Sequence, residues 1–428
     1  MKRENPEVFG AAHNDRDIGI ARTNSRNKAR GQDSWLSFEG RVTRSLLNSL
    51  GNPPIRITLW NGESIVTAPS NPVADMRIRS RFCLFKLLIN PELYFGDAYS
   101  NGSIEVDGDL VKFIEAVYQG LARARSTGLR SRLTGWLNRS HLNSLSDSRE
   151  NIHHHYDLGN EFYKLWLDQQ MVYTCAYFSS PDITLEQAQI AKMDHVCRKL
   201  RLRPEEIVIE AGCGWGALAL HMAAHYGVRV KAFNISHEQI VNAKARAHAL
   251  GVEHRVEFIE DDYRNANGRF DAFMSVGMLE HVGHEYYHDL RRVIDRSLDG
   301  NGRGLIHSIG RNRPNPFNAW VEKRIFPGAY PPSLREMLEV VEHWDFSVLD
   351  VENLRQHYAL TLKHWLQRFE YASGHIKEMY DERFVRAWRL YLAGSIAAFN
   401  TGDMQLFQVV FARGASNDVP WTRAYLYN

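Results

Sequence analysis

The sequence is poor in cysteine, almost without net charge and free of long apolar runs. Its four cysteines, Cys83, Cys175, Cys197 and Cys213, lack the spacing of a metal site and are too few for a disulfide framework. The 52 Lys and Arg residues nearly balance the 50 Asp and Glu residues, which gives no reason to expect a nucleic-acid partner. No stretch has the roughly 20 apolar residues that cross a bilayer, and the N-terminus lacks the apolar core of a signal peptide. We therefore expect a cytoplasmic protein that meets membranes only at their surface.

The 428 residues, 44% of them hydrophobic, are enough for two or three folding units. Residues 1–35 are polar and poor in aromatic side chains, which predicts a disordered arm. In residues 36–125 the pair Asn61-Gly62 lies between β-prone stretches and predicts a hairpin in which both turn residues have positive φ. Apolar helical patterns follow. These residues therefore predict a small N-terminal α+β domain.

A basic segment separates this domain from the rest. Residues 121–150 carry six arginines against two acids, with Leu and Trp interleaved. A solvated linker over residues 126–150 explains this composition, and so does an interfacial segment that contacts anionic lipid headgroups. Both interpretations stay open from the sequence.

Residues 151–428 alternate between β-prone stretches and helical patterns. This alternation predicts an α/β fold with a doubly wound, mostly parallel, Rossmann-like sheet. Strands are expected at residues 205–212, 228–235, 255–262, 270–277, 302–310 and 405–414. A long aromatic-rich helical segment is expected at residues 359–399, with part of its aromatic side chains lining an acyl tunnel.

A glycine-rich turn follows the first of these strands. Gly212, Gly214 and Gly216 allow a ligand to approach the backbone and the amides of the next helix. The pattern also satisfies a loose dinucleotide fingerprint, but the second strand ends in Asn234 without the carboxylate that binds ribose in NAD enzymes. Glu210 would repel a pyrophosphate and suits a ligand that carries an ammonium group. These charges favour S-adenosylmethionine as the cofactor.

Seven stretches between residues 150 and 415 resemble the cyclopropane-fatty-acyl-phospholipid synthase family, which is related to the mycolic acid cyclopropane synthases. They are HYDLGNEFYKLWLD, MVYTCAYF, IEAGCGWG, SVGMLEHVGHEYY, LIHSIG, IFPGAYPPS and YALTLKHWLQRF. The resemblance implies a class I methyltransferase domain that uses S-adenosylmethionine, and a homodimer. The N-terminal domain is similar to the module that precedes the methyltransferase domain in bacterial members acting on phospholipids. Phospholipid acyl chains are therefore the expected substrate.

The resemblance also implies which residues contact the cofactor. Asn234, Ser236 and Gln239, after the second strand, would lie under the ribose and methionine portions of the cofactor. Asp262 and Tyr263, after the third strand, would border its adenine. Thr174 replaces the serine of many relatives and keeps the hydroxyl. The cofactor-binding candidates are Tyr173, Thr174, Glu210, Gly212, Gly214, Trp215, Asn234, Ser236, Gln239, Asp262 and Tyr263.

The chemistry of such a reaction sets further demands. An isolated cis alkene is a weak nucleophile, and methylation leaves a carbocation that aromatic faces stabilise and that water would trap. Ring closure needs a weak base that removes a proton from the new methyl group. The resemblance implies that this base is a bound bicarbonate. Its implied ligands are Glu280, His307, Tyr358, Cys175 and the main-chain amide of Ile309.

Each of these residues also has an ordinary explanation when it is taken alone. Glu280 suits a helix cap, His307 and Tyr358 suit packing positions, and Cys175 suits a small buried hydrophobe. The triplet at residues 153–155 consists of histidines, but adjacent side chains point in different directions, so we expect no metal there. The joint match of the four residues favours the functional interpretation.

Ser395 departs from the family pattern, because several members carry a cysteine at this position. The alkene mechanism uses no thiol nucleophile, so we expect the thiol to be dispensable. The sequence as a whole predicts an enzyme at the inner face of the membrane that forms cyclopropane acyl chains. A methylene- or methyl-branched product from the same cofactor and substrate is the alternative. A non-catalytic lipid-binding protein with an inherited methyltransferase fold is a second alternative.

Overall fold

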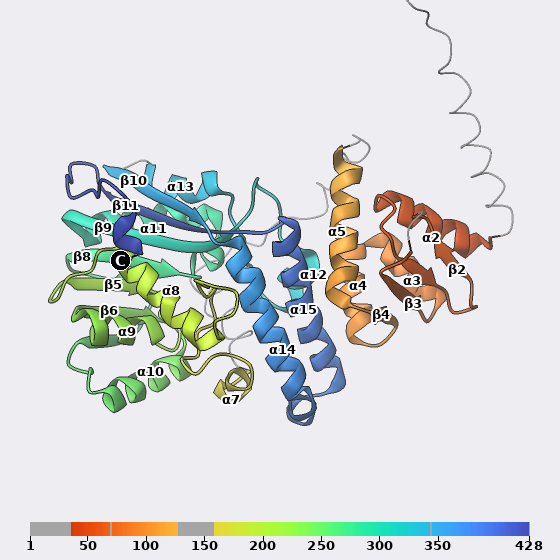
Figure 1. The fold of residues 1–428 in the computed structure, drawn as a ribbon, viewed down its shortest axis with the longest axis horizontal. Helices are drawn as coiled ribbons and strands as arrows, with labels where there is room; N and C mark the ends of the chain where they lie inside the picture. Colours follow the sequence, from red (N-terminus) through yellow and green to blue (C-terminus); the bar gives the residue numbers. More distant parts are fainter. Residues whose placement is uncertain (1–35, 69–70, 127–157, 343–344, 428) are drawn as a thin grey trace, which may run out of the picture.

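The computed structural model describes residues 36–68, 71–126, 158–342 and 345–427. The predicted arm at residues 1–35, nearly all of the basic segment and the histidine triplet lie outside the described residues. The chain forms a small α+β unit at its N-terminal end and a larger α/β unit, and the two lie side by side (Figure 1). No helix in the described part of the chain is long and apolar enough to span a membrane.

The N-terminal unit is built on a four-stranded sheet with the order β2-β1-β3-β4. Its elements are α2 (Phe38–Ser49), β1 (Arg56–Thr58), β2 (Ser64–Val66), β3 (Ala74–Ile78), α3 (Arg81–Ile89), α4 (Pro91–Ser100), β4 (Ile104–Gly108) and α5 (Leu110–Ser126). Strands β1 and β3 are parallel, and the other neighbours are antiparallel. The α+β prediction for this part of the chain is therefore confirmed.

The predicted hairpin exists, but its turn differs from the prediction. Strands β1 and β2 pair antiparallel around Asn61-Gly62, and only Gly62 has a positive φ, of 85°. The Gly62 amide donates to the Leu59 carbonyl at 2.9 Å, and the Leu59 amide donates to the Glu63 carbonyl at 2.8 Å. This is the pattern of a three-residue loop, in which a type I turn precedes one left-handed residue. The expectation of positive φ at both turn residues was therefore wrong.

The larger unit contains a seven-stranded sheet with the order β10-β11-β9-β8-β5-β6-β7. Its strands are β5 (Ile207–Ala211), β6 (Arg229–Asn234), β7 (Val256–Glu260), β8 (Phe270–Val276), β9 (Leu298–Gly310), β10 (Phe346–Asn353) and β11 (Gln405–Arg413). The five strands from β9 to β7 run parallel, and β11 is antiparallel to both β9 and β10. The predicted mostly parallel sheet is confirmed.

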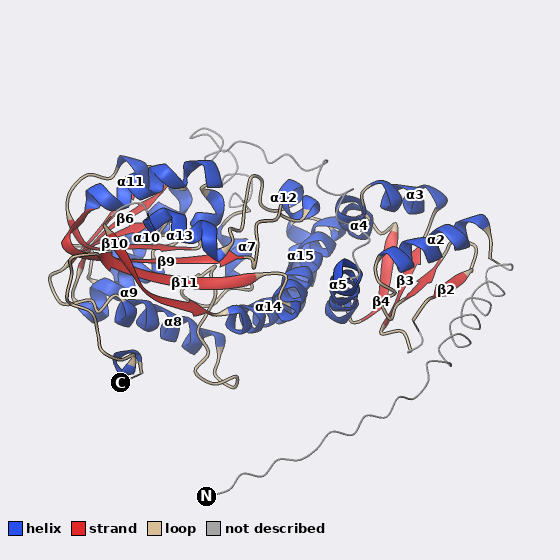
Figure 2. Cartoon of the chain, turned by 90° about the horizontal axis from the view of Figure 1, so that it is seen from above, coloured by secondary structure: helices blue, strands red, loops and turns tan. Residues whose placement is uncertain are grey.

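Helices cover both faces of this sheet (Figure 2). One face carries α8 (Leu185–Lys199), α9 (Ala217–Tyr226) and α10 (His237–Leu250), and the other carries α11 (Tyr287–Ser297) and α13 (Leu334–Glu342). The apolar side chains of each layer pack against the sheet because a nearly all-parallel sheet is buried on both sides. The carboxyl ends of β5, β6, β7 and β8 meet at one edge, where ligands bind in open α/β sheets.

All six predicted strands are present, but β10 was not predicted, because it is a half-exposed edge strand that also carries polar residues. The helical segment predicted at residues 359–399 consists of two helices, α14 (Arg355–Met379) and α15 (Glu382–Thr401). Asp381 separates them, since its carboxylate caps α15 by accepting the Phe384 amide at 2.6 Å. The predicted helical segment is therefore present and is divided into two helices.

The two units join at α15, which packs against α4 and α5 of the N-terminal unit (Figure 1). The Arg386 guanidinium donates to the main-chain oxygens of Tyr99 at 2.6 Å and Ile104 at 2.9 Å. In α12 (Ala319–Arg324), Arg324 forms a two-pronged ion pair with Asp97 at 3.0 and 2.9 Å. The N-terminal unit is thus fixed to the helices that also line the aromatic core.

Candidate active site

The glycine loop after β5 has an open inner side. Gly212, Gly214 and Gly216 all have positive φ, and Gly216 begins α9. Among the described residues, a Cβ added to Gly214 would meet no atom within 4 Å, whereas one on Gly212 would lie 3.0 Å from Met278. The amides of Gly212 and Cys213 both donate to the Phe233 carbonyl at 3.0 Å, which holds the loop against β6. The loop therefore offers backbone to a ligand at Gly214.

Glu210 lies in β5, two residues before the loop, and is only 3% exposed. Its Oε2 has no hydrogen-bond partner among the described residues. Burial raises the pKa of Glu210 to about 7, although nearby Lys192 lowers it. A buried acceptor without a partner beside an open glycine backbone fits a ligand that carries a cation and no phosphate. The residues present therefore fit S-adenosylmethionine.

Tyr173 and Thr174 come from the loop that precedes α8. The Tyr173 hydroxyl lies 2.9 Å from that of Tyr391, and the Thr174 hydroxyl accepts from Lys192 Nζ at 3.2 Å. A Cβ on Gly277, which follows β8, would lie 2.8 Å from Thr174 Cγ2. The structure therefore brings Thr174 to the carboxyl end of β8, beside the glycine loop.

Trp215 joins the loop to the short helix α7 (Asn160–Lys164), since its indole N–H donates to Asn160 Oδ1 at 2.7 Å. At the end of β6, Asn234 Nδ2 donates to the Gly214 carbonyl at 3.2 Å and to Gln239 Oε1 at 2.7 Å. Ser236 begins α10 and makes no side-chain capping bond. These predicted cofactor residues therefore surround the same loop.

Asp262 and Tyr263 follow β7, and Asp262 already has a strong partner. Its carboxylate accepts two bonds from the Arg264 guanidinium at 2.9 and 2.8 Å and caps the turn η2 (Tyr263–Asn265). Asp262 and Tyr263 lie at the carboxyl end of β7, which is paired with β6. The structure thus places both residues at the expected sheet edge, with the Asp262 carboxylate bound to Arg264.

Glu280 lies in the turn η3 (Leu279–His281) directly after β8 and is 6% exposed. Its Oε1 accepts the Ile309 amide at 2.5 Å, while Oε2 has no hydrogen-bond partner in the described part of the chain. Burial raises the pKa of Glu280 to about 7. The Ile309 amide, predicted to face the bicarbonate, therefore contacts the Glu280 carboxylate and orients it.

His307 lies in β9 beside Val276 of β8, which brings it to the same strand end as Glu280. It is 1% exposed, and its Nδ1 lies 3.0 Å from Gln408 Nε2. Burial, with repulsion from Lys192 and Lys199, lowers the pKa of His307 to about 3. The imidazole is therefore neutral at physiological pH.

Cys175 lies in the loop that precedes α8, and Tyr358 lies in α14. The fully buried Cys175 thiol donates to the Ala176 carbonyl at 3.1 Å, and burial raises its pKa, so it stays a thiol. The Ala176 amide donates to Thr361 Oγ1 at 3.0 Å, one turn from Tyr358 in α14. This bond packs the Cys175 segment against the helix that carries Tyr358.

A continuous aromatic cluster surrounds Tyr173. The ring of Tyr173 lies 5.3 Å from those of Trp166 and Trp365, and Trp365 lies 5.9 Å from Tyr358. Such a cluster excludes water and offers several ring faces to a cation. Tyr371 does not belong to it, because it is 96% exposed on the outer side of α14. The predicted aromatic stripe therefore contributes only in part.

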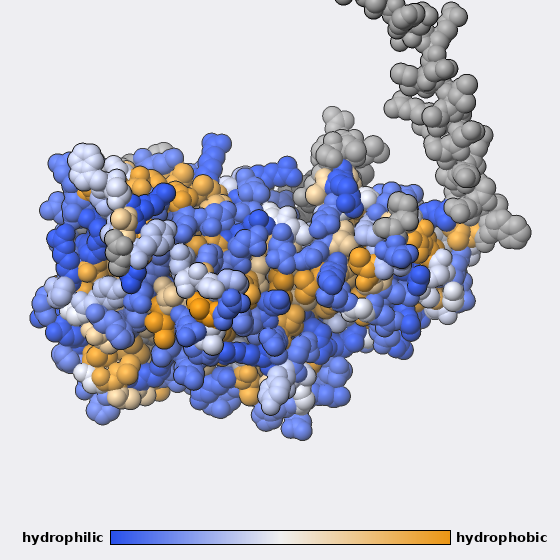
Figure 3. Space-filling model, viewed as in Figure 1, coloured by the Kyte–Doolittle hydropathy of each residue, from blue (hydrophilic) through white to orange (hydrophobic). Residues whose placement is uncertain are grey.

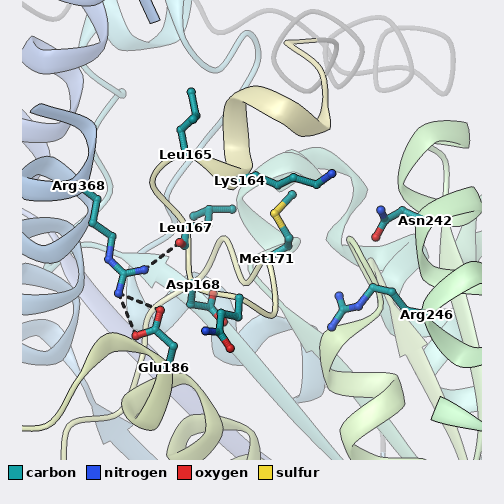
Figure 4. Close-up of a pocket in the computed structure, with 10 residues that line it drawn as sticks. Lys164, Leu165, Leu167, Asp168, Met171, Glu186, Asn242, Arg246 and Arg368 are labelled. Carbon is teal, nitrogen blue, oxygen red and sulfur yellow. Dashed lines mark hydrogen bonds and ion pairs between the residues drawn. The ribbon is translucent and has the colours of Figure 1, made fainter. Parts of the chain in front are cut away.

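A cavity of about 590 Å³ lies between α7, α8, α10 and α14, and Arg246 and Arg368 are among its lining residues (Figure 4). Arg246 links the cavity to the glycine loop, since its guanidinium donates to the main-chain oxygens of Trp215 at 3.1 Å and Gln170 at 3.0 Å. Across the cavity, Arg368 pairs with Glu186 at 2.8 Å. None of the predicted site residues lines this cavity.

Comparison with known proteins assigns the chain to a family. Residues 143–409 match the family described as mycolic acid cyclopropane synthetase, and residues 42–125 match a domain of unknown function. The cyclopropane-fatty-acyl-phospholipid synthase of Escherichia coli K12 is 36% identical over 359 residues, which cover 80% of this chain and 89% of that protein. The chain belongs to the mycolic acid cyclopropane synthetase family.

Two further similar proteins support this assignment. A probable fatty acid methyltransferase of Pseudomonas putida is 36% identical over 87% of this chain and 96% of its own length. The solved structure of mycolic acid cyclopropane synthase CmaA1 with SAH and CTAB is 29% identical, with a TM-score of 0.59 over 62% of this chain and 98% of that chain. The predicted family, fold class and enzyme type, an S-adenosylmethionine-dependent methyltransferase, are therefore confirmed.

Two further buried polar residues near the site, Lys192 and Gln408, were not predicted from the sequence. Lys192 is 2% exposed and occupies the core face of α8, where Ala188 and Val196 precede and follow it by one turn. A lysine at helical spacing between apolar residues was the signal that could have identified it. Gln408 is fully buried in β11, and its contact with His307 depends on strand pairing that no local pattern reveals.

Proposed function

We propose that this methyltransferase transfers a methylene group from S-adenosylmethionine to the cis double bond of phospholipid acyl chains and closes a cyclopropane ring. The observation that carries the proposal is that Glu280 and neutral His307 are buried at adjacent strand ends, and that one Glu280 oxygen has no hydrogen-bond partner among the described residues. The Escherichia coli relative named as a synthase of this kind supports the substrate class.

The glycine loop and its neighbours would hold the cofactor. Gly214 offers open backbone, Glu210 offers a buried acceptor for the ammonium group, and Asn234 with Gln239 forms the adjoining polar edge. When bound, S-adenosylmethionine supplies an electrophilic methyl group. Trp215 and α7 would close one side of the loop. The main contribution of the protein would be to orient the alkene near that methyl group.

The aromatic cluster around Tyr173 would stabilise the carbocation that methyl transfer leaves on the acyl chain. Ring faces attract a cation without forming a bond to it. Cys175 supports the same requirement, because the raised pKa of its thiol leaves no thiolate to trap the cation. The site therefore combines a low-polarity wall with few nucleophiles.

Glu280, His307, Tyr358 and Cys175 would hold a bicarbonate, which supplies the weak base for ring closure. Glu280 Oε2, which has no hydrogen-bond partner among the residues that the structure describes, would accept the hydroxyl of this anion, and Ile309 fixes the carboxylate through Oε1. Lys192 supplies positive charge near this site, since it lowers the pKa values of both His307 and Cys175. A buried anion needs such a cation nearby.

The product is tested by lipid mass spectrometry after expression in a host that lacks cyclopropane lipids. A cyclopropane chain is heavier than its precursor by one methylene and resists catalytic hydrogenation. A methylene-branched chain takes up hydrogen, and a methyl-branched chain is already heavier by two further hydrogens. Either of these results would replace the ring with a branched product.

We also propose that the enzyme docks on the inner face of the membrane through α3. Residues Cys83, Leu84 and Leu87 face the core, yet Phe82 and Ile89 on the outer side are 69% and 72% exposed. A helix that is apolar on all sides is expected to be buried on all sides. Figure 3 shows further apolar patches on the surface of the N-terminal unit.

The charges of α3 favour an anionic lipid surface. The helix carries Arg81 and Lys86 and no acid, and Lys86 Nζ lies 4.4 Å from the centre of the Phe82 ring. Cations beside exposed aromatic and aliphatic side chains are typical of interfacial helices. All four cysteines are free, which agrees with a reducing cytoplasm on this side of the membrane.

Vesicle sedimentation tests the docking surface. Phe82→Ser combined with Ile89→Ser is expected to abolish binding to phosphatidylglycerol vesicles and to leave the affinity for SAH unchanged. Val241→Ser is the matched control, because Val241 is 50% exposed on α10. If light scattering shows that the double variant turns a dimer into a monomer, α3 is a subunit interface instead. The homodimer itself remains a prediction that the same measurement checks.

A further inference from the structure

A row of three polar side chains runs from the site to the edge of the sheet. Strand β11 lies between β9 and β10, and its Gln408 is paired with His307 on one side and with Glu352 on the other. Residues that are directly opposite in adjacent strands point to the same face. Gln408 is fully buried and is the neighbour of His307 on the side away from β8.

The contact between the two side chains is specific. Gln408 Nε2 lies 3.0 Å from His307 Nδ1, and an amide nitrogen can only donate a hydrogen bond. His307 is neutral, because burial and the cations of Lys192 and Lys199 lower its pKa to about 3. A neutral imidazole carries one N–H. If Nδ1 accepts, that hydrogen must be on Nε2.

We infer that Gln408 is a positioning residue that holds His307 as the Nε2–H tautomer and so makes it a hydrogen-bond donor toward the anion. The inference rests on the proposed function of the site. The Glu280 oxygen without a partner can accept, and His307 would donate, so the two groups bind opposite ends of a hydrogen carbonate ion. The reverse tautomer would direct a lone pair at the anion and repel it.

The opposite orientation of the Gln408 amide is less favourable. Gln408 Oε1 has no hydrogen-bond partner among the described residues. Turning the amide would place a buried NH₂ group with two donors where this single acceptor now lies, in a region where Lys192 and Lys199 already add positive charge. Beyond Gln408, Glu352 Oε2 accepts from His195 at 2.7 Å and forms an ion pair with Lys199 at 2.6 Å, so this oxygen is engaged.

Long-range ¹⁵N–¹H NMR of the histidine-labelled full chain tests the tautomer. The signal of His307 is assigned by its loss in His307→Gln. The inference predicts a protonated Nε2 and an unprotonated Nδ1 in the wild type. A proton on Nδ1 would overturn the inference, whatever lipid the enzyme makes. A protonated Nε2 in an enzyme that makes no ring would instead refute the proposed function alone.

Gln408→Glu supplies the second arm of the test. A carboxylate can only accept a hydrogen bond, so the proton of His307 moves to Nδ1. The imidazole then no longer donates to the anion, and kcat falls by about 10²-fold, the usual effect of removing one hydrogen-bond donor to an anion. The KM for S-adenosylmethionine stays unchanged. Gln408→Met keeps the test informative if the glutamate variant does not fold, because it is expected to give a mixed tautomer and a smaller loss.

Gln405→Met is the matched control, since Gln405 is a buried glutamine of the same strand that contacts Asn353 instead of His307. It is expected to leave the tautomer and kcat unchanged. Wild-type kcat in Gln408→Glu with a reversed tautomer would show that donation by His307 does not matter for turnover.

Discussion

Replacing Glu280 by glutamine changes one atom of the anion site and preserves its geometry. The amide oxygen of the glutamine can still accept the Ile309 amide, which now donates to Oε1 at 2.5 Å. The NH₂ group then replaces Oε2, the oxygen that has no hydrogen-bond partner in the described part of the chain. An acceptor for the hydroxyl of the anion thus becomes a donor. The variant therefore tests the role of Glu280 as an anion anchor.

The expected loss of activity follows from the bond that is removed. A hydrogen bond to a charged group contributes about 1.5–3 kcal/mol, which corresponds to a decrease in kcat of about 10- to 150-fold. The expected change in stability has the opposite sign. The pKa of Glu280 is 4.5 when unfolded and about 7 when folded, so the folded state is destabilised by about 3 kcal/mol above pH 7. This penalty is absent below pH 4.5, where both states are protonated. Glutamine removes it.

Three measurements check this prediction. Steady-state kinetics at several bicarbonate concentrations should show the loss in kcat, and calorimetry with SAH should show an unchanged affinity. Denaturant unfolding should show that the variant gains stability relative to the wild type as the pH rises from 5 to 8. Glu285→Gln, an exposed neighbour in η4 (His284–Tyr286), is the control and should change none of these. Wild-type kcat in Glu280→Gln would refute the anchor role.

Three further predictions concern the cofactor loop, the buried cation and the missing cysteine. Gly214→Ala should lower SAH affinity at least about tenfold and cost about 1 kcal/mol of stability, whereas Gly251→Ala, with a similar φ of 67° and open surroundings, should cost only the stability; equal affinities would contradict the assignment of the loop. Lys192→Met should raise stability below pH 8, because folding lowers the pKa of Lys192 from 10.5 to about 8, and thermal unfolding checks this. The same variant should weaken the dependence of kcat on bicarbonate, which kinetics check. Lower stability with an unchanged bicarbonate dependence would contradict the prediction. Ser395→Ala should keep kcat within about twofold, and a loss above tenfold would show that this position takes part in the chemistry.

The sequence predicts the parts of this fold that local patterns determine. The glycine loop is recognisable because three glycines follow a buried strand, and all three have positive φ. The strand β10 escapes prediction, because an edge strand with exposed and polar positions lacks the apolar run of its neighbours. The break between α14 and α15 escapes as well, since a single capping residue, Asp381, ends a pattern that is apolar on both sides.

The site depends more on tertiary contacts than on local pattern. Glu280 and Ile309 are predicted as separate ligands of an anion, but the pairing of β8 with β9 brings the amide of one to the carboxylate of the other. A hydrogen bond from the Ala176 amide to Thr361 holds the Cys175 segment against the helix that carries Tyr358, and no local pattern shows this contact. The domain limits and the individual roles of the site residues stay predictions.

Deuterium counting tests the central claim, that the new methyl group loses a proton to close a ring. The purified enzyme is given S-adenosylmethionine with a CD₃ group, phosphatidylglycerol vesicles with cis-unsaturated chains, and bicarbonate. The account predicts a product that keeps two of the three deuterium atoms, resists hydrogenation, and forms more slowly when bicarbonate is removed. A product that keeps all three deuterium atoms would contradict the account, because the methyl group would then have lost no proton.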